Sequence, residues 1–244
     1  MRKILLTLRY DGTDYHGWQV QPNGITVQER LQDAVEAVFG SRLGVTGCSR
    51  TDSGVHAYMF CCHINVDSAI PCEKIVKALN VHLPFDIAVC DCIDVDGEFH
   101  ARYSSKGKNY IYKMYDSDVR DPFLAGHALY YKAKLDAELM NEAARKFIGT
   151  HDFSSFCSSG SSVESNVRTV TESFVEREGK LVTFNVTANG FLYNMVRIMV
   201  GTLIRVSEGA ILPDDIEAII DAKNRSLAGP TAPAHGLYLN KVLY

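Results

Sequence analysis

The sequence predicts an α+β fold, because strand and helix signals follow one another in the same order twice along the 244-residue chain. Each half gives the order strand, helix, strand, strand, helix, strand, which is the βαββαβ order of a ferredoxin-like unit. The halves repeat this order without obvious residue identity. We therefore expect two ferredoxin-like halves related by a pseudo-twofold axis, with joined sheets and a cleft between them. The expected boundaries are 1–96 for the first half, 97–107 for the connection and 108–244 for the second half.

Apolar alternation and helix-capping residues place the elements of the first half. Thr26 and Glu29 form a capping box, and the helical apolar pattern that follows them ends at Gly40. Pro71 begins a second helix, since proline is favoured in the first turn. The segment 58–66 is nearly all apolar, which is typical of a strand buried on both faces. The other expected strands are 3–10, 43–46 and 87–95.

The second half repeats this order. Asp136 caps a helix that closes at Gly149, and the apolar run 192–206 predicts another helix, with an extra one over 213–223. The serine-rich tract 149–166 is irregular in pattern, and we expect it to form a mobile surface flap. The expected strands are 108–115, 167–176, 181–189 and 236–243, of which the middle two form a hairpin.

Composition indicates an ordinary globular protein, with 46% hydrophobic and 22% charged residues. No apolar run approaches the roughly 18 residues that cross a bilayer. Arg9 and Asp11 interrupt the N-terminal apolar run far short of a signal-peptide core. The cytoplasm is therefore the expected location. The net charge of −4 counts only weakly against nucleic-acid binding, because the distribution of charge matters more than its total.

Several common site types lack support in the sequence. The seven cysteines are odd in number and contain no Cys-x-x-Cys pair, which argues against a disulfide framework. Cys62 and His63 could supply zinc ligands, but their spacing does not fit a finger or ribbon, so buried thiols are the favoured interpretation. Neither a nucleotide-binding glycine motif nor a Gly-x-Ser-x-Gly elbow occurs. No metal and no organic cofactor is expected.

The segment 47–57 (GCSRTDSGVHA) joins two expected strands and carries the first candidate site. Arg50 and Asp52 could share one face if the backbone between them is extended. Ser53 and Gly54 favour a turn, which would display the carboxylate where one strand ends and let it face a cleft. The alternative is an ordinary turn in which the carboxylate of Asp52 caps its own backbone.

Arg197 stands among apolar residues of the expected helix 192–206. A buried arginine is rarely left unpaired, so Arg197 either extends to solvent or pairs with a buried carboxylate. Asp52 is the candidate partner, and such an ion pair would keep its carboxylate ionised and oriented.

Tyrosines alternate with cations between Phe99 and Tyr115, a stretch without an acid. Cations beside aromatic rings suit a single-stranded or flipped-base RNA, whereas the alternative is a tyrosine-rich strand with a solvated lysine edge. Tyr110 can stack on a base and offer its hydroxyl for proton transfer, or it can be a core tyrosine. The candidate contacts to an RNA backbone are Arg102, Lys106 and Lys108.

Several blocks of the chain resemble the bacterial tRNA pseudouridine synthase A family. The segment 47–57 resembles its Arg-Thr-Asp-x-Gly-Val-His motif. The other blocks are 9–21 (RYDGTDYHGWQVQ), 99–110 (FHARYSSKGKNY), 149–156 (GTHDFSSF), 191–201 (FLYNMVRIMVG) and 234–239 (AHGLYL), which stand in the family's order and span nearly the whole chain. Ser49 departs from the Gly or Ala that many members carry there, and we expect only a slight change in loop packing.

The resemblance implies an isomerase that converts uridine to pseudouridine in the anticodon stem-loop of tRNA, around positions 38–40. It implies that Asp52 is the nucleophile, attacking either the base or the sugar. By the same resemblance, Tyr110 stacks on the everted base and helps to remove the C5 proton, Arg50 helps to draw the nucleotide out of the stem, and Arg197 binds the carboxylate. The family needs no metal or cofactor. Its members are homodimers in which one tRNA, through its anticodon stem-loop and elbow, contacts both subunits.

Two other function classes compete with this one. A non-catalytic RNA-binding module or tRNA chaperone would use the basic tyrosine strand and would not need Arg50, Asp52 and Arg197 together. A zinc-dependent enzyme would use the neighbouring Cys and His residues.

Overall fold

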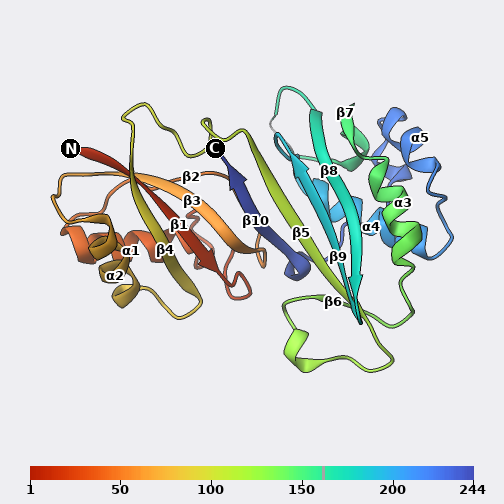
Figure 1. Ribbon diagram of the computed structural model, residues 1–244, viewed down its shortest axis with the longest axis horizontal. Helices are drawn as coiled ribbons and strands as arrows, with labels where there is room; N and C mark the ends of the chain where they lie inside the picture. Colours follow the sequence, from red (N-terminus) through yellow and green to blue (C-terminus); the bar gives the residue numbers. More distant parts are fainter. Residues whose placement is uncertain (161–162) are drawn as a thin grey trace. The chain divides into compact units, whose positions relative to one another are not determined.

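The computed structural model describes residues 1–160 and 163–244, and it confirms an α+β fold (Figure 1). The chain forms two compact units. Unit 1 contains Met1–Lys106 and Tyr238–Tyr244, and unit 2 contains Gly107–Leu237. No helix in the described parts of the chain has both the length and the apolar character needed to cross a membrane.

The sheet of unit 1 has four strands in the order β4 (Ile87–Val95), β1 (Arg2–Tyr10), β3 (His56–Val66) and β10 (Leu237–Leu243). Strand β1 runs antiparallel to both of its neighbours, and β10 runs parallel to β3, with Tyr238 opposite His56. The two-residue strand β2 (Thr46–Gly47) also pairs with β3. Of the expected strand 43–46, only Thr46 joins the sheet.

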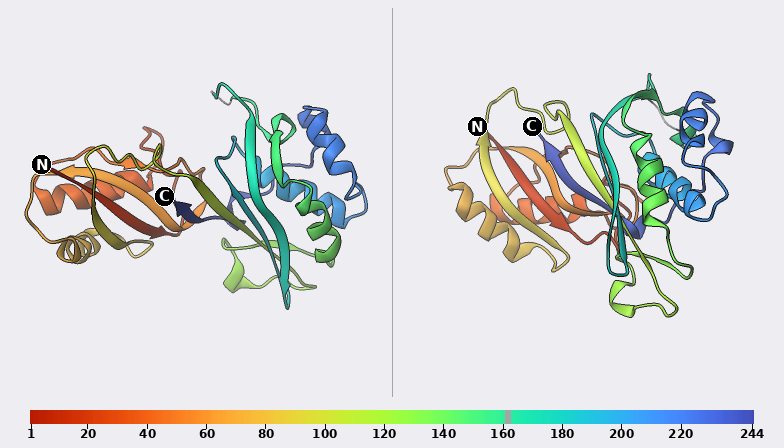
Figure 2. Two further views of the ribbon diagram at one scale, coloured as in Figure 1. Left: turned by 45° about the horizontal axis from the view of Figure 1, so that its top comes forward. Right: turned by 45° about the vertical axis from the view of Figure 1, so that its right-hand side comes forward.

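Two helices cover one face of this sheet, α1 (Val27–Phe39) and α2 (Cys72–His82) (Figure 2). Thr26 is the N-cap of α1, as predicted, because its hydroxyl accepts a hydrogen bond from the amide of Glu29. Gly40 ends α1 in the left-handed region, as expected. The order β1, α1, β2, β3, α2, β4 is the predicted one.

The sheet of unit 2 has the order β5 (Gly107–Asp116), β9 (Leu181–Ala188), β8 (Val167–Glu178) and β7 (Gly149–Asp152), all antiparallel. Strand β6 (Leu129–Tyr131) pairs parallel with β5. The predicted hairpin is therefore confirmed as β8 and β9.

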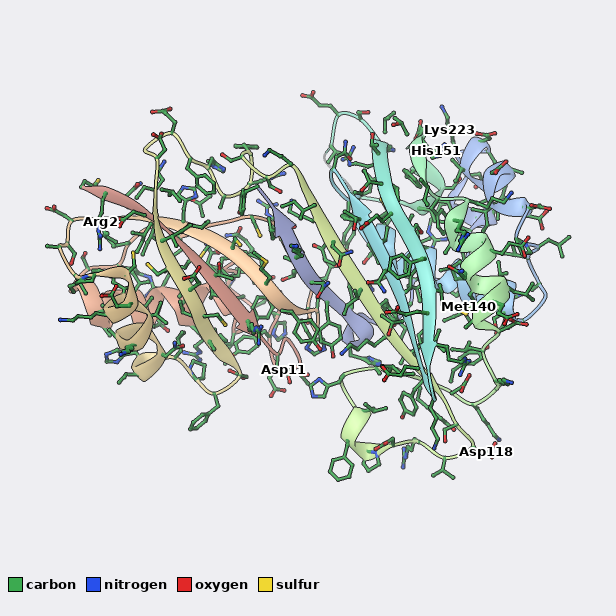
Figure 3. All side chains as sticks on the ribbon, viewed as in Figure 1. Arg2, Asp11, Asp118, Met140, His151 and Lys223 are labelled. Atoms are coloured by element: carbon green, nitrogen blue, oxygen red, sulfur yellow. The ribbon has the colours of Figure 1, made fainter. Side chains whose placement is uncertain are left out.

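Three helices lie against one face of this sheet, α3 (Ala137–Arg145), α4 (Met195–Ser207) and α5 (Asp215–Asp221) (Figure 2). Helix α3 packs against β8 and α4. Its Met140, which is labelled in Figure 3, is fully buried. Helix α4 is buried along most of its length, as its apolar sequence predicts. Short 3-10 helices are η1 (Pro122–Leu124), η2 (Ser154–Phe156), η3 (Arg225–Leu227) and η4 (Ala234–Gly236).

Three expectations for the second half need correction. Helix α3 ends at Arg145. Gly149 is the first residue of strand β7, because the segment from Gly149 pairs with β8 and does not continue the helix. Helix α4 begins three residues later than expected, since Asn194 takes the left-handed conformation. The start of the expected flap 149–166 forms β7 and η2, and Phe153, between them, and Phe156 of η2 are buried. Residues 161 and 162 of that tract lie outside the described residues.

The final strand β10 pairs with β3, and its residues from Tyr238 onward belong to unit 1. The expected division, which gives this strand to the second half 108–244, stays a prediction. Unit 2 in turn adds β6 before α3 and β7 before the β8–β9 hairpin. The pairing partner of a chain end depends on distant residues, so the local pattern of β10 could not indicate it.

Candidate functional site

Asp52 lies at a turn between β2 and β3, as the sequence predicts. The amide of Val55 donates to the Asp52 carbonyl at 3.2 Å, and Gly54 has a φ of +76°. Burial alternates along this segment, with Arg50 exposed, Thr51 buried and Asp52 half-buried. The buried Thr51 anchors the segment, and the two charged residues beside it are less buried than Thr51.

The Asp52 loop (residues 50–55) is held by the N-terminal loop (residues 11–24). The amide of Trp18 donates to the Thr51 carbonyl at 3.1 Å. On the other side of Asp52, the carbonyl of Tyr15 accepts from the Gly54 amide at 3.2 Å and from the Ser53 hydroxyl at 3.1 Å. Backbone hydrogen bonds therefore fix the chain on both sides of the carboxylate.

Two glycines allow this close approach. A Cβ at Gly12 would lie 2.0 Å from the Val55 carbonyl oxygen, and one at Gly17 would lie 2.4 Å from the Thr51 carbonyl oxygen. Gly17 also has a φ of +82°, a backbone conformation that residues other than glycine rarely adopt. The glycines of the N-terminal loop thus let its backbone pack directly against the backbone of the Asp52 loop.

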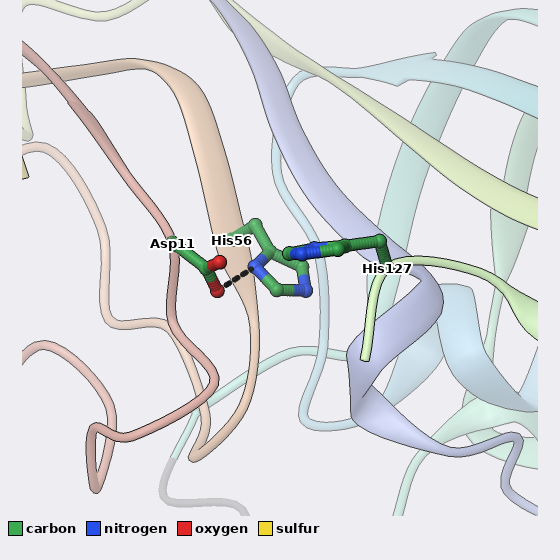
Figure 4. Close-up of side chains that lie close together, drawn as sticks. All are labelled: Asp11, His56 and His127. Atoms are coloured by element: carbon green, nitrogen blue, oxygen red, sulfur yellow. Dashed lines mark ion pairs between the residues drawn. The ribbon is translucent and has the colours of Figure 1, made fainter. Parts of the chain in front are cut away.

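His56 begins β3 and closes the Asp52 loop. Its Nδ1 atom lies 3.0 Å from the amide nitrogen of Gly12 and 3.0 Å from Oδ1 of Asp11, which directly follows β1 (Figures 3 and 4). A neutral His56 accepts from Gly12 at this atom, whereas a protonated Nδ1 donates to the carboxylate. The His56 ring also stacks on Tyr238 of β10, with centroids 4.6 Å apart. The end of the motif is therefore tied to both the N-terminal loop and the sheet.

Tyr110 and Arg197 belong to unit 2. Tyr110 is buried near the start of β5, and the ring of Phe191 meets it edge-on with centroids 5.0 Å apart. Arg197 lies in the first turn of α4 and is half-buried. Arg50 and Asp52 belong to unit 1. The pairing of Asp52 with Arg197 stays a prediction.

The guanidinium of Arg197 is held by its own unit. Its Nε donates to the Ala232 carbonyl at 2.7 Å, and Nη1 donates to the Asn194 side-chain oxygen at 2.8 Å. The Ala232 amide in turn donates to the Arg197 carbonyl at 3.0 Å. Burial raises the pKa of nearby Tyr112, although the positive charge of Arg197 opposes this shift. The segment 228–233 therefore fixes the place of the charge.

The candidate RNA-backbone contacts lie at accessible positions. Arg102 and Lys106 are exposed, and Lys108 is half-buried. The Arg102 guanidinium lies 5.6 Å from the centroid of the exposed Tyr103 ring, whose plane stacks on His100. These rings and cations are available to a large ligand.

His63 supports this stretch from β3. Its Nδ1 accepts a hydrogen bond from the Ala101 amide at 3.1 Å. Burial lowers the pKa of His63 to about 4, and the positive charges of His100 and Lys3 add to the shift. His63 is therefore neutral at neutral pH and serves as an acceptor.

The cysteines of unit 1 are mainly packing residues, as the sequence suggested. Cys48, Cys61, Cys62 and Cys92 are buried. Burial raises the pKa of the Cys62 thiol well above its ordinary value, which favours the protonated form.

The sequence interpretation missed the contact between the N-terminal loop and the Asp52 loop. Two signals could have indicated it. The loop contains Gly12 and Gly17 beside its single Trp18, and an irregular segment of this length is unusual unless it is packed or functional. Trp18 is fully buried and stacks on Phe60 of β3, with centroids 4.0 Å apart.

Comparisons with known proteins identify the family of this chain. A family model described as tRNA pseudouridine synthase matches residues 7–104 and 143–244. The tRNA pseudouridine synthase A of Acetivibrio thermocellus is 48% identical over 244 residues, and that of Clostridium acetobutylicum is 45% identical over 244 residues. The one from Ruminiclostridium cellulolyticum is 47% identical over 246 residues. Each alignment covers 100% of both chains.

Among solved structures, a chain in a crystal structure of a Cbf5-Nop10-Gar1 complex aligns with a TM-score of 0.35 at 13% identity, covering 99% of this chain and 58% of that chain. A TM-score this low carries no argument about function or fold. The family model and the full-length relatives show the family: this chain belongs to the tRNA pseudouridine synthase family, a family of isomerases.

Proposed function

We propose that this chain converts uridine to pseudouridine in the anticodon stem-loop of tRNA, around positions 38–40, with Asp52 as the nucleophile. Its family membership supports tRNA pseudouridylation. The observation that carries the assignment to Asp52 is its setting: a half-buried residue on a turn whose backbone is fixed on both sides. A carboxylate held in this way needs little rearrangement before it attacks.

The chemistry balances without an oxidant or reductant. The bond between N1 and C1′ breaks, the uracil turns, and a new bond forms between C5 and C1′. C5 loses a proton and N1 gains one, so substrate and product are isomers. Asp52 forms a bond to C1′ or to C6 of the base in the first stage and is released in the last. Both routes require an ionised carboxylate at the start.

Three other side chains complete the proposal. Arg50 is exposed beside Asp52, which supports a role in drawing the nucleotide out of its stem. Tyr110 has its ring plane set by Phe191, which supports stacking on the everted base and assistance in removing the C5 proton. Arg197 carries a charge fixed by Ala232 and Asn194, and we propose that this charge keeps Asp52 ionised.

The partner is tRNA, bound through its anticodon stem-loop and elbow by a homodimer in the cytoplasm. The accessible positions of Arg102, Lys106 and Lys108 support contacts to the RNA backbone. We also propose that residues 1–96 and 108–244 are the two ferredoxin-like halves that the order of elements predicts. The expected salt dependence of tRNA binding is steep, because phosphate contacts release counterions.

The test is tritium release from a tRNA transcript that contains 5-tritiated uridine, with chemical mapping of the modified position. The expected result is that the unaltered chain turns over many tRNA molecules, whereas Asp52→Asn releases no tritium and still folds and binds tRNA. Substantial turnover by Asp52→Asn would overturn the assignment. If the unaltered chain binds tRNA but forms no pseudouridine, the RNA-binding module is the correct interpretation instead.

A further inference from the structure

We propose that Tyr10 and Thr51 are positioning residues, whose hydroxyl-to-hydroxyl hydrogen bond sets the place of the adjacent Asp52 carboxylate. This inference rests on the proposed role of Asp52 and adds the device that aims it. Tyr10 ends β1, and Thr51 immediately precedes Asp52 in the irregular Asp52 loop.

The bond joins the loop directly to the sheet. The two hydroxyl oxygens lie 2.9 Å apart and are buried, with the Tyr10 residue 4% exposed and the Thr51 residue 7% exposed. Strand β1 lies between β3 and β4, so Tyr10 is held from both sides, opposite Ala57 and Ile87. The fixed end of the bond is therefore Tyr10, and the residue that it positions is Thr51.

Thr51 is well suited to transmit this position. Its side chain branches at Cβ, which restricts rotation about χ1, so a bond to its hydroxyl also restrains its backbone. Because Thr51 faces inward, its neighbours Arg50 and Asp52 are less buried than Thr51. The Trp18 amide holds the carbonyl of the same residue at 3.1 Å. Two independent bonds thus act on the residue beside the carboxylate, and one of them is between side chains.

The side-chain bond can be removed without changing the packing. Thr51→Val keeps the branched shape and removes the hydroxyl, Tyr10→Phe removes the other hydroxyl, and Thr51→Ser keeps the hydroxyl and removes a methyl group. A displacement of about 1 Å at a reacting group costs on the order of 100-fold in rate. We expect Thr51→Val and Tyr10→Phe to lower kcat by about 10- to 100-fold, because each loosens the carboxylate by part of this distance.

The pattern across variants separates positioning from general destabilisation. KM for tRNA should stay within about twofold, because the loop's accessible side chains remain. Thr51→Ser should retain most of the kcat of the unaltered chain, because it keeps the hydroxyl. The double variant Tyr10→Phe, Thr51→Val should have about the same kcat as the less active of the two single variants, since both changes remove the same bond.

Tyr244→Phe is the matched control. It removes a tyrosine hydroxyl bond of 2.8 Å, to the Ala101 carbonyl, from the same unit and should leave kcat unchanged. Circular dichroism and thermal melting give the folded fraction of each variant, and kcat is calculated per folded molecule.

The outcomes of this experiment are distinct. The inference is overturned if Thr51→Val and Tyr10→Phe keep kcat within twofold, if their effects add in the double variant, or if Tyr244→Phe loses as much. Asp52→Asn is measured in parallel. If it retains turnover, the proposed function fails; if it is inactive while Tyr10→Phe and Thr51→Val are fully active, only the positioning role fails.

Discussion

Asp52 in unit 1 and Arg197 in unit 2 are both placed by irregular segments, but the two segments are held differently. In unit 1, the Asp52 loop is held by a second irregular segment, the N-terminal loop, through Trp18 and Tyr15. In unit 2, the segment 228–233 is held by a regular helix, since the Ala232 amide donates to the Arg197 carbonyl of α4. The position of a loop that is held by another loop depends on irregular backbone conformations in both segments. The position of a loop that is held by a helix depends on an irregular conformation in the loop alone, because the helix is regular.

The glycines at the two contacts show the same difference. A Cβ at Gly201, inside α4, would lie 1.7 Å from the Pro230 carbonyl oxygen, and Gly201 has ordinary helical geometry. Gly17 meets the Thr51 carbonyl oxygen at 2.4 Å and in addition has a positive φ. Substitution at Gly17 therefore combines backbone strain with a clash, and substitution at Gly201 gives the clash alone.

Gly17→Ala should have the largest effect of the structural substitutions. The left-handed conformation costs an alanine about 1–2 kcal/mol, and the clash adds about 1–3 kcal/mol. We expect the free energy of unfolding to fall by about 2–5 kcal/mol and kcat to fall by more than tenfold, because the Thr51 carbonyl must move. Denaturant unfolding and tritium release measure the two quantities.

Gly40→Ala is the control for backbone strain alone. Gly40 has a φ of +75° with open space where its Cβ would lie. It should lose about 1–2 kcal/mol of unfolding free energy and no activity. Equal losses at Gly17 and Gly40 would show that the close approach contributes nothing, and the comparison between the two loops would then be wrong.

Gly201→Ala should have a smaller effect on stability. The clash with Pro230 costs about 1–3 kcal/mol, but alanine is a better helix former than glycine by about 1 kcal/mol, which offsets part of this cost. We expect a net loss of up to about 2 kcal/mol of unfolding free energy, with a reduced kcat because Ala232, an anchor of Arg197, shifts with the segment 228–233. The same two assays apply.

Gly44→Ala is the matched control, since a Cβ there meets open space and the residue has no positive φ. It should change neither quantity. If Gly201→Ala leaves both stability and kcat unaltered, then α4 does not hold the segment 228–233 in the way described.

The parts of the fold that were predicted from sequence depend on neighbouring residues. The N-cap at Thr26, the stop at Gly40 and the turn after Asp52 are local features, and the structure confirms each. The end of α3 and the start of β7 depend on pairing with β8, some 20 residues away, so the helical pattern up to Gly149 was misleading. The pairing of β10 with β3 is more distant still.

The candidate site divides in the same way. Arg50, Asp52, Tyr110 and Arg197 could be named from their motifs, because residue types and spacing carry that information. The bond between Tyr10 and Thr51 joins residues 41 positions apart and involves side chains common in any core. A sequence pattern does not record which hydroxyls meet, so the support of Asp52 required the structure.

The smallest expected effect is on the pH dependence of stability. It distinguishes the hydrogen bond of His63 in unit 1 from the hydrogen bonds of Arg197 in unit 2. Unit 1 holds the amide of Ala101 through the ring of His63, whose pKa is lowered to about 4, whereas the Arg197 support in unit 2 uses backbone carbonyls and an Asn side chain. Below its ordinary pKa of about 6.5, His63 takes up a proton in the unfolded chain but not in the folded one. This contribution to stability is therefore complete above about pH 6.5 and declines as pH falls toward about 4.

His63→Gln should remove this dependence, because glutamine can accept from the Ala101 amide and does not titrate. Between pH 7 and pH 5, the unfolding free energy of the unaltered chain should fall by up to about 1.4 kcal/mol per pH unit more than that of His63→Gln. Denaturant unfolding at the two pH values measures this difference. Hydrogen exchange should show faster opening at pH 5 near Ala101, after correction for the intrinsic rate, and no such change at Ala232. Parallel stability profiles for the two chains would show that His63 is not the group that makes unit 1 sensitive to acid.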